Sequence, residues 1–184
     1  VDGIPVRRFR VDRKRDRNRF DQLSARIYHN PRAELKDQME WMELQGPLSS
    51  GMMDYIRQNR DRYDLFLFMT YLYYTTFVGL QQVPEKSMLI PTAHDEPPIY
   101  LGIFRPFFHL PRAMVYLTEE EKQLVNRKFR NGYKPSDVVG VGIDLPESVD
   151  ADGFREKYHI KGDFLIYVGR LDESKGLKEL FDFF

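Results

Sequence analysis

Four apolar runs, separated by segments of helical character, constrain what this chain can fold into. The runs are Tyr63–Met69, Lys86–Pro91, Ala113–Leu117 and Val138–Ile143. The first is nearly continuous in apolar residues and the others share its character, which is typical of strands covered on both faces. Helices are expected between the runs, at Leu72–Gln82, Ile99–Phe108 and Glu119–Arg130. Strands that alternate with helices predict an α/β fold built on a parallel sheet.

Further helices are expected before the first run. Two helical stretches lie between Phe20 and Gln45, broken near Asn30-Pro31. The second presents an apolar face, formed by Leu35, Met39 and Met42, with Trp41 and Leu44 beside it. The helix expected after the third run begins with a capping box, in which Thr118 and Glu121 satisfy free backbone N–H groups.

A basic run follows a predicted strand near the start of the sequence. Ile4–Val11 mixes apolar and basic residues in near-alternation, which indicates a half-buried strand. The cations between Arg7 and Arg19 suit a phosphate group or an anionic membrane surface. The alternative is a solvated loop whose charge is balanced by Asp12, Asp16 and Asp21.

The composition excludes several classes of protein. The net charge of zero argues against a general polyanion binder, so we expect no nucleic-acid partner. The absence of cysteine excludes disulfides and thiolate metal sites. No apolar run approaches the roughly 18–20 residues of a membrane-spanning helix. We expect a cytoplasmic protein, with peripheral contact at the inner face of the membrane if the basic run binds lipid.

Polar residues follow each predicted strand, where open parallel sheets bind their ligands. Tyr71 follows the first run, and His94-Asp95-Glu96 is the densest group after the second. Adjacent residues cannot all face one ion, so we expect no metal site. A nucleophilic triad needs a serine or cysteine at a sharp elbow, and the sequence shows no such elbow. His94 is therefore the leading candidate for a substrate contact.

Structural roles compete with functional ones for these residues. Asp95 or Glu96 suits the cap of a helix opened by Pro97-Pro98, which leaves His94 available for a ligand. The tyrosines after the first run are more often packed between helix and sheet, with only their hydroxyls reaching water. Tyr71 is retained among them as a candidate contact.

The last twenty-one residues form a predicted strand, turn and helix suited to an anion. Phe164–Val168 is the strand, and the turn contains Gly169, Arg170 and Lys175. The glycine lets the backbone come close, the helix N-terminus offers free N–H groups, and the cations supply charge. The alternative is a solvated turn in which the cations pair with nearby acids, namely Asp172 and Glu173.

A domain boundary is predicted between residues 144 and 145. Leu145–Gly153 is polar, contains proline and lacks periodicity, so it suits an interdomain linker. Residues 1–144 then form one domain, and residues 145–184 supply the linker and the first βα unit of another. Such a unit cannot bury its own apolar face, so a whole domain is expected to follow it.

The sequence resembles a known family over nearly its whole length. One segment resembles the opening of the donor-binding domain of family 4 retaining glycosyltransferases, also called group 1 glycosyltransferases. This segment is YVGRLDESKGLKELFDFF. The later half of their acceptor-side domain is similar to MLIPTAHDEPPIYLGIFRPFF followed by VYLTEEEKQLVNRKF. A bacterial branch is similar to EWMELQGPLSSGMMDYI and YDLFLFMTYLYYTTFVGL. The resemblance implies a Rossmann-like parallel sheet with flanking helices, as part of the two-domain GT-B fold.

The resemblance also implies an activity and residues to perform it. A sugar would pass, with retention, from a nucleotide-diphosphate sugar to a carbohydrate or lipid-linked acceptor, as in polysaccharide biosynthesis, without cofactor or metal. Arg170, Lys175 and Gly169 would bind the donor diphosphate, and His94 would lie at the reaction centre. The assignment suits the chemistry, because the leaving nucleoside diphosphate develops negative charge that fixed cations stabilise. Asp95 is a further candidate contact.

Parts of the family pattern are expected outside this sequence. A first strand with a glycine-rich loop should precede Val1, and a spaced pair of glutamates should follow Phe184. The chain alone is therefore expected not to turn over, and its exposed apolar faces to favour self-association. Two alternatives stay open: a sugar-nucleotide epimerase or phosphorylase of the same architecture, and a non-catalytic Rossmann-like scaffold. The glutamate pair would support transfer, and its loss would support the scaffold.

Overall fold

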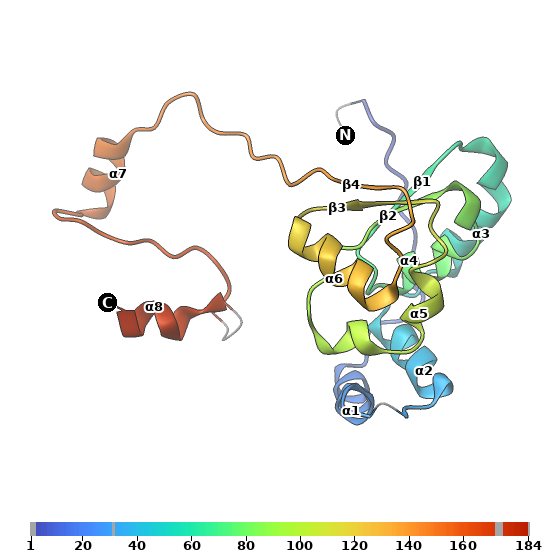
Figure 1. Cartoon of the computed structure of the whole chain (residues 1–184). Coiled ribbons are helices and arrows are strands. Elements are labelled where there is room, and N and C mark those ends of the chain that lie inside the picture. The colour runs from blue at the N-terminus through green and yellow to red at the C-terminus, as the bar shows by residue number, and fades with distance from the viewer. Residues whose placement is uncertain (1–2, 31, 172–174, 184) are drawn as a thin grey trace. The chain divides into compact units, whose positions relative to one another are not determined.

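The chain folds into two compact units, Val1–Gly142 and Ile143–Phe184. The computed structural model, shown in Figure 1, describes residues 3–30, 32–171 and 175–183. The first unit contains the sheet and most of the helices. The second contains α7 (Ala151–Tyr158) and α8 (Leu177–Phe183). The assignment of residues 145–184 to the opening of a donor-binding domain stays a prediction.

A parallel four-stranded sheet in the order β1-β2-β3-β4 is the centre of the first unit. Its strands are β1 (Phe66–Met69), β2 (Ser87–Ile90), β3 (Ala113–Tyr116) and β4 (Ser136–Val138). The predicted α/β class and parallel sheet are confirmed, and the arrangement is one that Rossmann-like folds share. The last predicted run is wrong in its extent, because the strand ends at Val138 and the next five residues are irregular.

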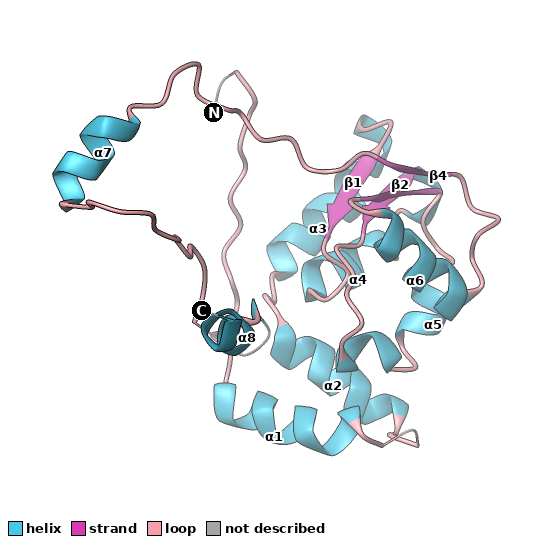
Figure 2. Ribbon diagram, turned by 60° about the vertical axis from the view of Figure 1, so that its left-hand side comes forward, coloured by secondary structure: helices cyan, strands magenta, loops and turns pink. Residues whose placement is uncertain are grey.

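The helices that connect the strands lie on one side of this sheet (Figures 1 and 2). The α-helices are α1 (Arg17–Tyr28), α2 (Leu35–Gln45), α3 (Ser50–Asn59), α4 (Tyr74–Leu80), α5 (Phe104–Phe107) and α6 (Glu119–Phe129). Short 3₁₀ turns are η1 (Arg60–Arg62), η2 (Pro84–Lys86) and η3 (Pro97–Tyr100). Each connection steps to the next strand in the same direction, so right-handed crossovers place α4, α5 and α6 on one face.

The opposite face of the sheet is open, which corrects the expectation of strands covered on both faces. On β2, Ser87 and Leu89 are fully buried, whereas Met88 and Ile90, which alternate with them, are only half-buried. On the edge strand β1, Leu67 is 58% exposed and Met69 is 57% exposed. Continuous apolar character therefore does not mean two covered faces here, because the crossovers cover one face only.

Buried aromatic rings stabilise the covered face. The segment expected as one helix, Ile99–Phe108, is divided into η3 and the short helix α5, because Leu101 adopts an extended backbone before Gly102. A helix of this length is marginal alone. Its buried rings stack on neighbouring elements, with Phe107 5.1 Å from Phe77 and Phe108 4.1 Å from Phe129 between ring centroids.

The buried face of α2 differs from the face that the sequence indicates. Leu35 and Met39 are exposed, whereas Trp41 and Met42 are buried together with Gln38 and Leu44. The indole of Trp41 sets this orientation, because its N–H donates to the Ser24 hydroxyl of α1 at 2.9 Å. Its ring also contacts the rings of Phe20 and Tyr28.

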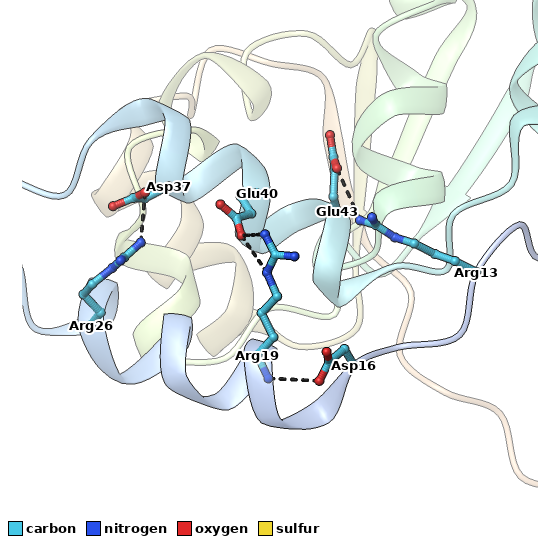
Figure 3. A network of polar contacts seen from close by, with 7 residues as sticks. All are labelled: Arg13, Asp16, Arg19, Arg26, Asp37, Glu40 and Glu43. Atoms are coloured by element: carbon cyan, nitrogen blue, oxygen red, sulfur yellow. Dashed lines mark hydrogen bonds and ion pairs between the residues drawn. The ribbon is translucent and has the colours of Figure 1, made fainter.

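The arginines of the basic run pair mainly with α2. Residues 4–11 form no strand, so that prediction is wrong. In Figure 3, Arg13 contacts Glu43, Arg19 contacts Glu40, and Arg26, from the last turn of α1, contacts Asp37. The acids expected to balance these cations have other roles: Asp16 caps α1, and Asp12 accepts from the backbone N–H of Ser50 at 2.7 Å.

The predicted strand in the second unit is not formed. Residues 164–168 have no strand partner among the described residues, and Leu165, Ile166 and Val168 are exposed. An isolated strand leaves its backbone N–H and C=O groups unpaired, so the apolar pattern alone cannot stabilise it. The helix expected after Gly176 is present as α8.

Candidate functional site

The carboxyl ends of β1, β2 and β3 meet at one rim of the sheet in the first unit. Beside it lies a hollow of about 620 Å³. Residues 92–95, which follow β2, form one wall, and Thr118, Glu120, Glu121 and Arg127 contribute to the other. The parallel sheet thus brings together the segments that follow the second and third apolar runs, as the sequence predicts.

Glu121 links the two walls of the hollow. Its carboxylate is buried, and Oε1 accepts from the backbone N–H of Ala93 at 2.7 Å while Oε2 accepts from that of Leu117 at 2.8 Å. Thr118 caps α6 as predicted, accepting from the Glu121 N–H. The capping box also predicts a hydrogen bond from the Thr118 backbone N–H to the Glu121 carboxylate. That part of the prediction is wrong, because the carboxylate accepts from the N–H groups of Leu117 and Ala93 instead. One side chain therefore fixes the loop that carries His94.

Two threonines with left-handed backbones follow directly after β1 and β2. Thr70 has φ 66° and Thr92 has φ 49°, a region that β-branched residues rarely enter. Their hydroxyls lie 3.0 Å apart, with Thr92 donating to Thr70. Such strain costs of order 1–3 kcal/mol per residue and concentrates at functional sites. The sequence indicates both threonines only through their position after an apolar run.

His94 and Asp95 both lie at the hollow. His94 is exposed, and its imidazole makes no hydrogen bond or ion pair with any part of the chain that the structure describes. Asp95 accepts from the Tyr100 hydroxyl at 2.6 Å, and this hydrogen bond raises the pKa of Tyr100. The predicted side-chain cap of η3 is wrong, because neither Asp95 nor Glu96 makes that hydrogen bond.

Glu96 is half-buried beside His94. Burial raises the pKa of the Glu96 carboxyl, and the nearby charge of His94 opposes that change. The backbone N–H of Glu96 donates to the His94 carbonyl at 2.9 Å, which tightens the turn between them. The imidazole is therefore presented on a loop whose backbone is held on both sides.

Tyr71 does not reach the hollow. Its side chain is fully buried, with its ring centroid 4.8 Å from that of Phe104 and 5.4 Å from that of Phe108. Its hydroxyl has no hydrogen-bond partner among the described residues, and burial raises its pKa. Tyr71 is therefore a core residue, and its retention as a substrate contact is wrong for this structure.

The predicted anion-binding turn belongs to the second unit. Arg170 and Lys175 are exposed, and the Tyr167 hydroxyl donates to the Arg170 carbonyl at 2.7 Å. A Cβ on Gly169 would lie 2.7 Å from the Tyr167 hydroxyl oxygen, so the glycine makes this close turn feasible. The acids of the solvated-turn alternative, Asp172 and Glu173, lie outside the described residues.

Neither a metal centre nor a membrane-spanning helix is present among the described residues. Within them, no group of three or more His, Cys, Asp or Glu side chains is placed to hold a metal ion. No described helix combines the length and apolar character needed to cross a membrane.

Comparison with protein-family models, curated proteins and solved structures found no match to this chain. The likeness to retaining glycosyltransferases consequently depends on the motifs of the sequence itself.

Proposed function

We propose that the chain belongs to a glycosyltransferase that transfers a sugar, with retention, from a nucleotide-diphosphate donor to a glycan or glycoconjugate acceptor. The observation that carries this proposal is the hollow of about 620 Å³ at the carboxyl ends of β2 and β3, with an unpaired, exposed His94 beside it. Ligands of open parallel sheets bind at this edge. The two-domain architecture, the donor and the acceptor are parts of the proposal.

In this proposal His94 contacts the transferred sugar. A neutral imidazole donates one hydrogen bond and accepts another, which suits the hydroxyl groups of a sugar ring. Asp95 adds acceptors next to it and is oriented by Tyr100. The brace from Glu121 supports precise placement, because it fixes the loop backbone at Ala93. No metal or cofactor is required.

Arg170 and Lys175 bind the donor diphosphate in the second unit. Charge-assisted hydrogen bonds from a guanidinium and an ammonium suit phosphate oxygens, and they stabilise the charge that develops as the diphosphate leaves. Gly169 allows the backbone of the turn to approach the ligand.

The first experiment is calorimetric titration of the 184-residue chain with nucleoside diphosphates. We expect Arg170→Ala and Lys175→Ala each to weaken binding about tenfold, since a hydrogen bond to a charged group contributes about 1.5–3 kcal/mol. Lys161→Ala is the matched control, because Lys161 is an exposed cation of the same unit. Unchanged affinity in Arg170→Ala would remove the diphosphate role.

His94 is tested with a pair of ligands in place of a control variant. His94→Ala should weaken binding of nucleotide sugars several-fold and leave binding of the corresponding nucleoside diphosphates unchanged, because only the former carry the sugar that the imidazole contacts. Equal loss for both ligands, or none, would contradict the assignment. An epimerase or phosphorylase would share these phosphate contacts, and analysis of the reaction products of the whole enzyme would identify it.

A non-catalytic Rossmann-like scaffold is the second candidate. The uncovered apolar face of the sheet favours it, because exposed apolar surface of this kind often marks an interaction site. Absence of diphosphate binding, combined with self-association of the chain, would support the scaffold against the transferase.

A further inference from the structure

Two further hollows open on the first unit, beside α5 and the end of α6. Their volumes are about 380 Å³ and about 460 Å³, and they share four lining residues: Tyr100, Leu101, Arg105 and Lys128. Arg130 and His109 line only the smaller one, and His29 with Asn30 line only the larger. Because of the shared wall, we treat the two as one site and name it the Arg105–Lys128 hollow.

Among the described residues, no acid lines the Arg105–Lys128 hollow to balance its positive charge. The described lining residues of both parts include Arg105, Lys128 and Arg130 but no aspartate or glutamate. Arg105 and Lys128 form no ion pair with any described residue. This differs from α1 and its preceding segment, where arginines contact acids of α2 (Figure 3).

The two cations are close enough to influence each other. Lys128 is half-buried, and its pKa is lowered first by that burial and then by the charge of Arg105, while the charge of Asp95 opposes the change. The negative end of the helix dipole favours a lysine near the C-terminus of α6. That role does not account for Arg105, which belongs to α5 and repels the lysine. An anion bound between them would relieve the repulsion.

Tyr100 holds the lysine in position for such a ligand. The Lys128 ammonium lies 3.5 Å from the centroid of the Tyr100 ring, in a cation–π contact. The ring is itself fixed by the hydrogen bond from its hydroxyl to Asp95. The ammonium thus keeps donors available, while the exposed guanidinium of Arg105 offers a planar fork that matches two phosphate oxygens.

We propose that the Arg105–Lys128 hollow binds a phosphate-bearing ligand. Arg105 and Lys128 contact the phosphate, and the Tyr100 ring forms an apolar wall for the group attached to it. The site shares no lining residue with the hollow beside His94, to which it is linked through the Tyr100–Asp95 hydrogen bond. It is also distinct from the turn at Arg170, because all of its lining residues belong to the first unit.

The test is a titration of the ¹⁵N-labelled 184-residue chain with inorganic phosphate and pyrophosphate at constant ionic strength, followed by NMR. We expect the chemical-shift changes to cluster on residues that line the hollow. Arg105→Gln and Lys128→Gln should each weaken binding about tenfold, as expected for loss of a charged hydrogen bond. Arg112→Gln is the matched control, because Arg112 is exposed and lines neither part of the hollow.

Three outcomes would overturn the proposal. The first is a phosphate affinity that is unchanged in both variants, and the second is a set of chemical-shift changes that cluster outside the hollow. The third is chloride that occupies the site as well as phosphate does. Arg105 is exposed, so Arg105→Gln remains informative if Lys128→Gln alters the fold. Vesicles of phosphatidylcholine with and without phosphatidic acid then identify the source. Binding to the acidic vesicles that phosphate competes away indicates a lipid headgroup, and phosphate binding without vesicle binding indicates a soluble phosphorylated ligand.

Discussion

Glu121 illustrates how one side chain positions a site. Its carboxylate pairs two backbone N–H groups, at Ala93 and Leu117, that have no strand partner. Glutamine keeps the length of the side chain but replaces one acceptor oxygen with a donor, so one N–H loses its partner. We expect Glu121→Gln to lower the free energy of unfolding by about 1.5–3 kcal/mol.

Chemical denaturation measures that change, and hydrogen exchange should speed up at the Ala93 or Leu117 amide. Glu120→Gln is the control, because Glu120 is the exposed neighbour of the same charge, and we expect a change within about 0.5 kcal/mol. Equal stability of the two variants would show that the brace contributes little.

The buried hydroxyl of Tyr71 gives the opposite prediction. It has no hydrogen-bond partner among the described residues, so removing it abolishes a desolvation cost without breaking a contact. Tyr71→Phe should therefore stabilise the protein by about 1 kcal/mol. Burial raises the pKa of Tyr71, so the folded state keeps this proton when the unfolded state has lost it.

The stability that depends on this proton is lost as the pH rises above about 10, the ordinary tyrosine value. The advantage of Tyr71→Phe in thermal unfolding should therefore grow above that pH. A variant less stable than the natural chain at neutral pH would reveal a hydrogen bond that the hydroxyl makes in solution.

At the scale of one element, α2 separates sequence pattern from packing. Leu35 and Met42 share the apolar face that the sequence indicates, yet Leu35 is 65% exposed and Met42 is fully buried. We expect Met42→Ala to cost about 2–5 kcal/mol, as for other buried large-to-small changes. Leu35→Ala should change stability by about 0.5 kcal/mol or less. Denaturant unfolding of both variants measures the difference in free energy of unfolding. Similar losses of stability in the two variants would mean that α2 buries the face that the sequence indicates.

Local signals and long-range contacts explain which elements the sequence predicts. The alternation of strands and helices is local, so β1 to β3, α4 and α6 are predicted at nearly their observed positions. The orientation of α2 depends on the Trp41 contact with Ser24, seventeen residues away, which leaves no periodic signal. Residues 4–11 and 164–168 carry strand-like patterns, but a strand also needs a partner whose backbone it can pair with.

The same distinction applies to the site. His94 and Asp95 are predicted because they follow an apolar run, and parallel strands bring such positions to one rim. The brace from Glu121 to Ala93 spans twenty-eight residues, so the sequence suggests only a local cap. The left-handed backbones of Thr70 and Thr92 are also without a local signal, because threonine rarely adopts them.

At the scale of the whole first unit, strand order decides which surface stays open. In the order β1-β2-β3-β4, every crossover advances in one direction, so its helices gather on one face. A doubly wound sheet covers its second face through strands added in the opposite direction beyond the first. No such strand pairs with β1 among the described residues, which leaves both the edge of β1 and the apolar rows beside it exposed.

This open surface predicts self-association that charge can abolish. Leu67 and Met69 point away from the covered face of β1, and their exposed positions can accept long charged side chains without disturbing the core. A lysine on an edge strand also opposes pairing with a second chain. The double variant Leu67→Lys, Met69→Lys should therefore remain folded and shift the chain from oligomer towards monomer.

Sedimentation velocity over a range of concentrations measures the shift, and circular dichroism checks the fold. Leu89→Lys is the matched control, because Leu89 is fully buried on the neighbouring strand and an unpaired charge there should unfold the protein. A natural chain that is monomeric throughout would show that exposed apolar residues on this sheet do not by themselves drive association. Oligomers that persist in the folded double variant would instead place the contact on another surface of the molecule.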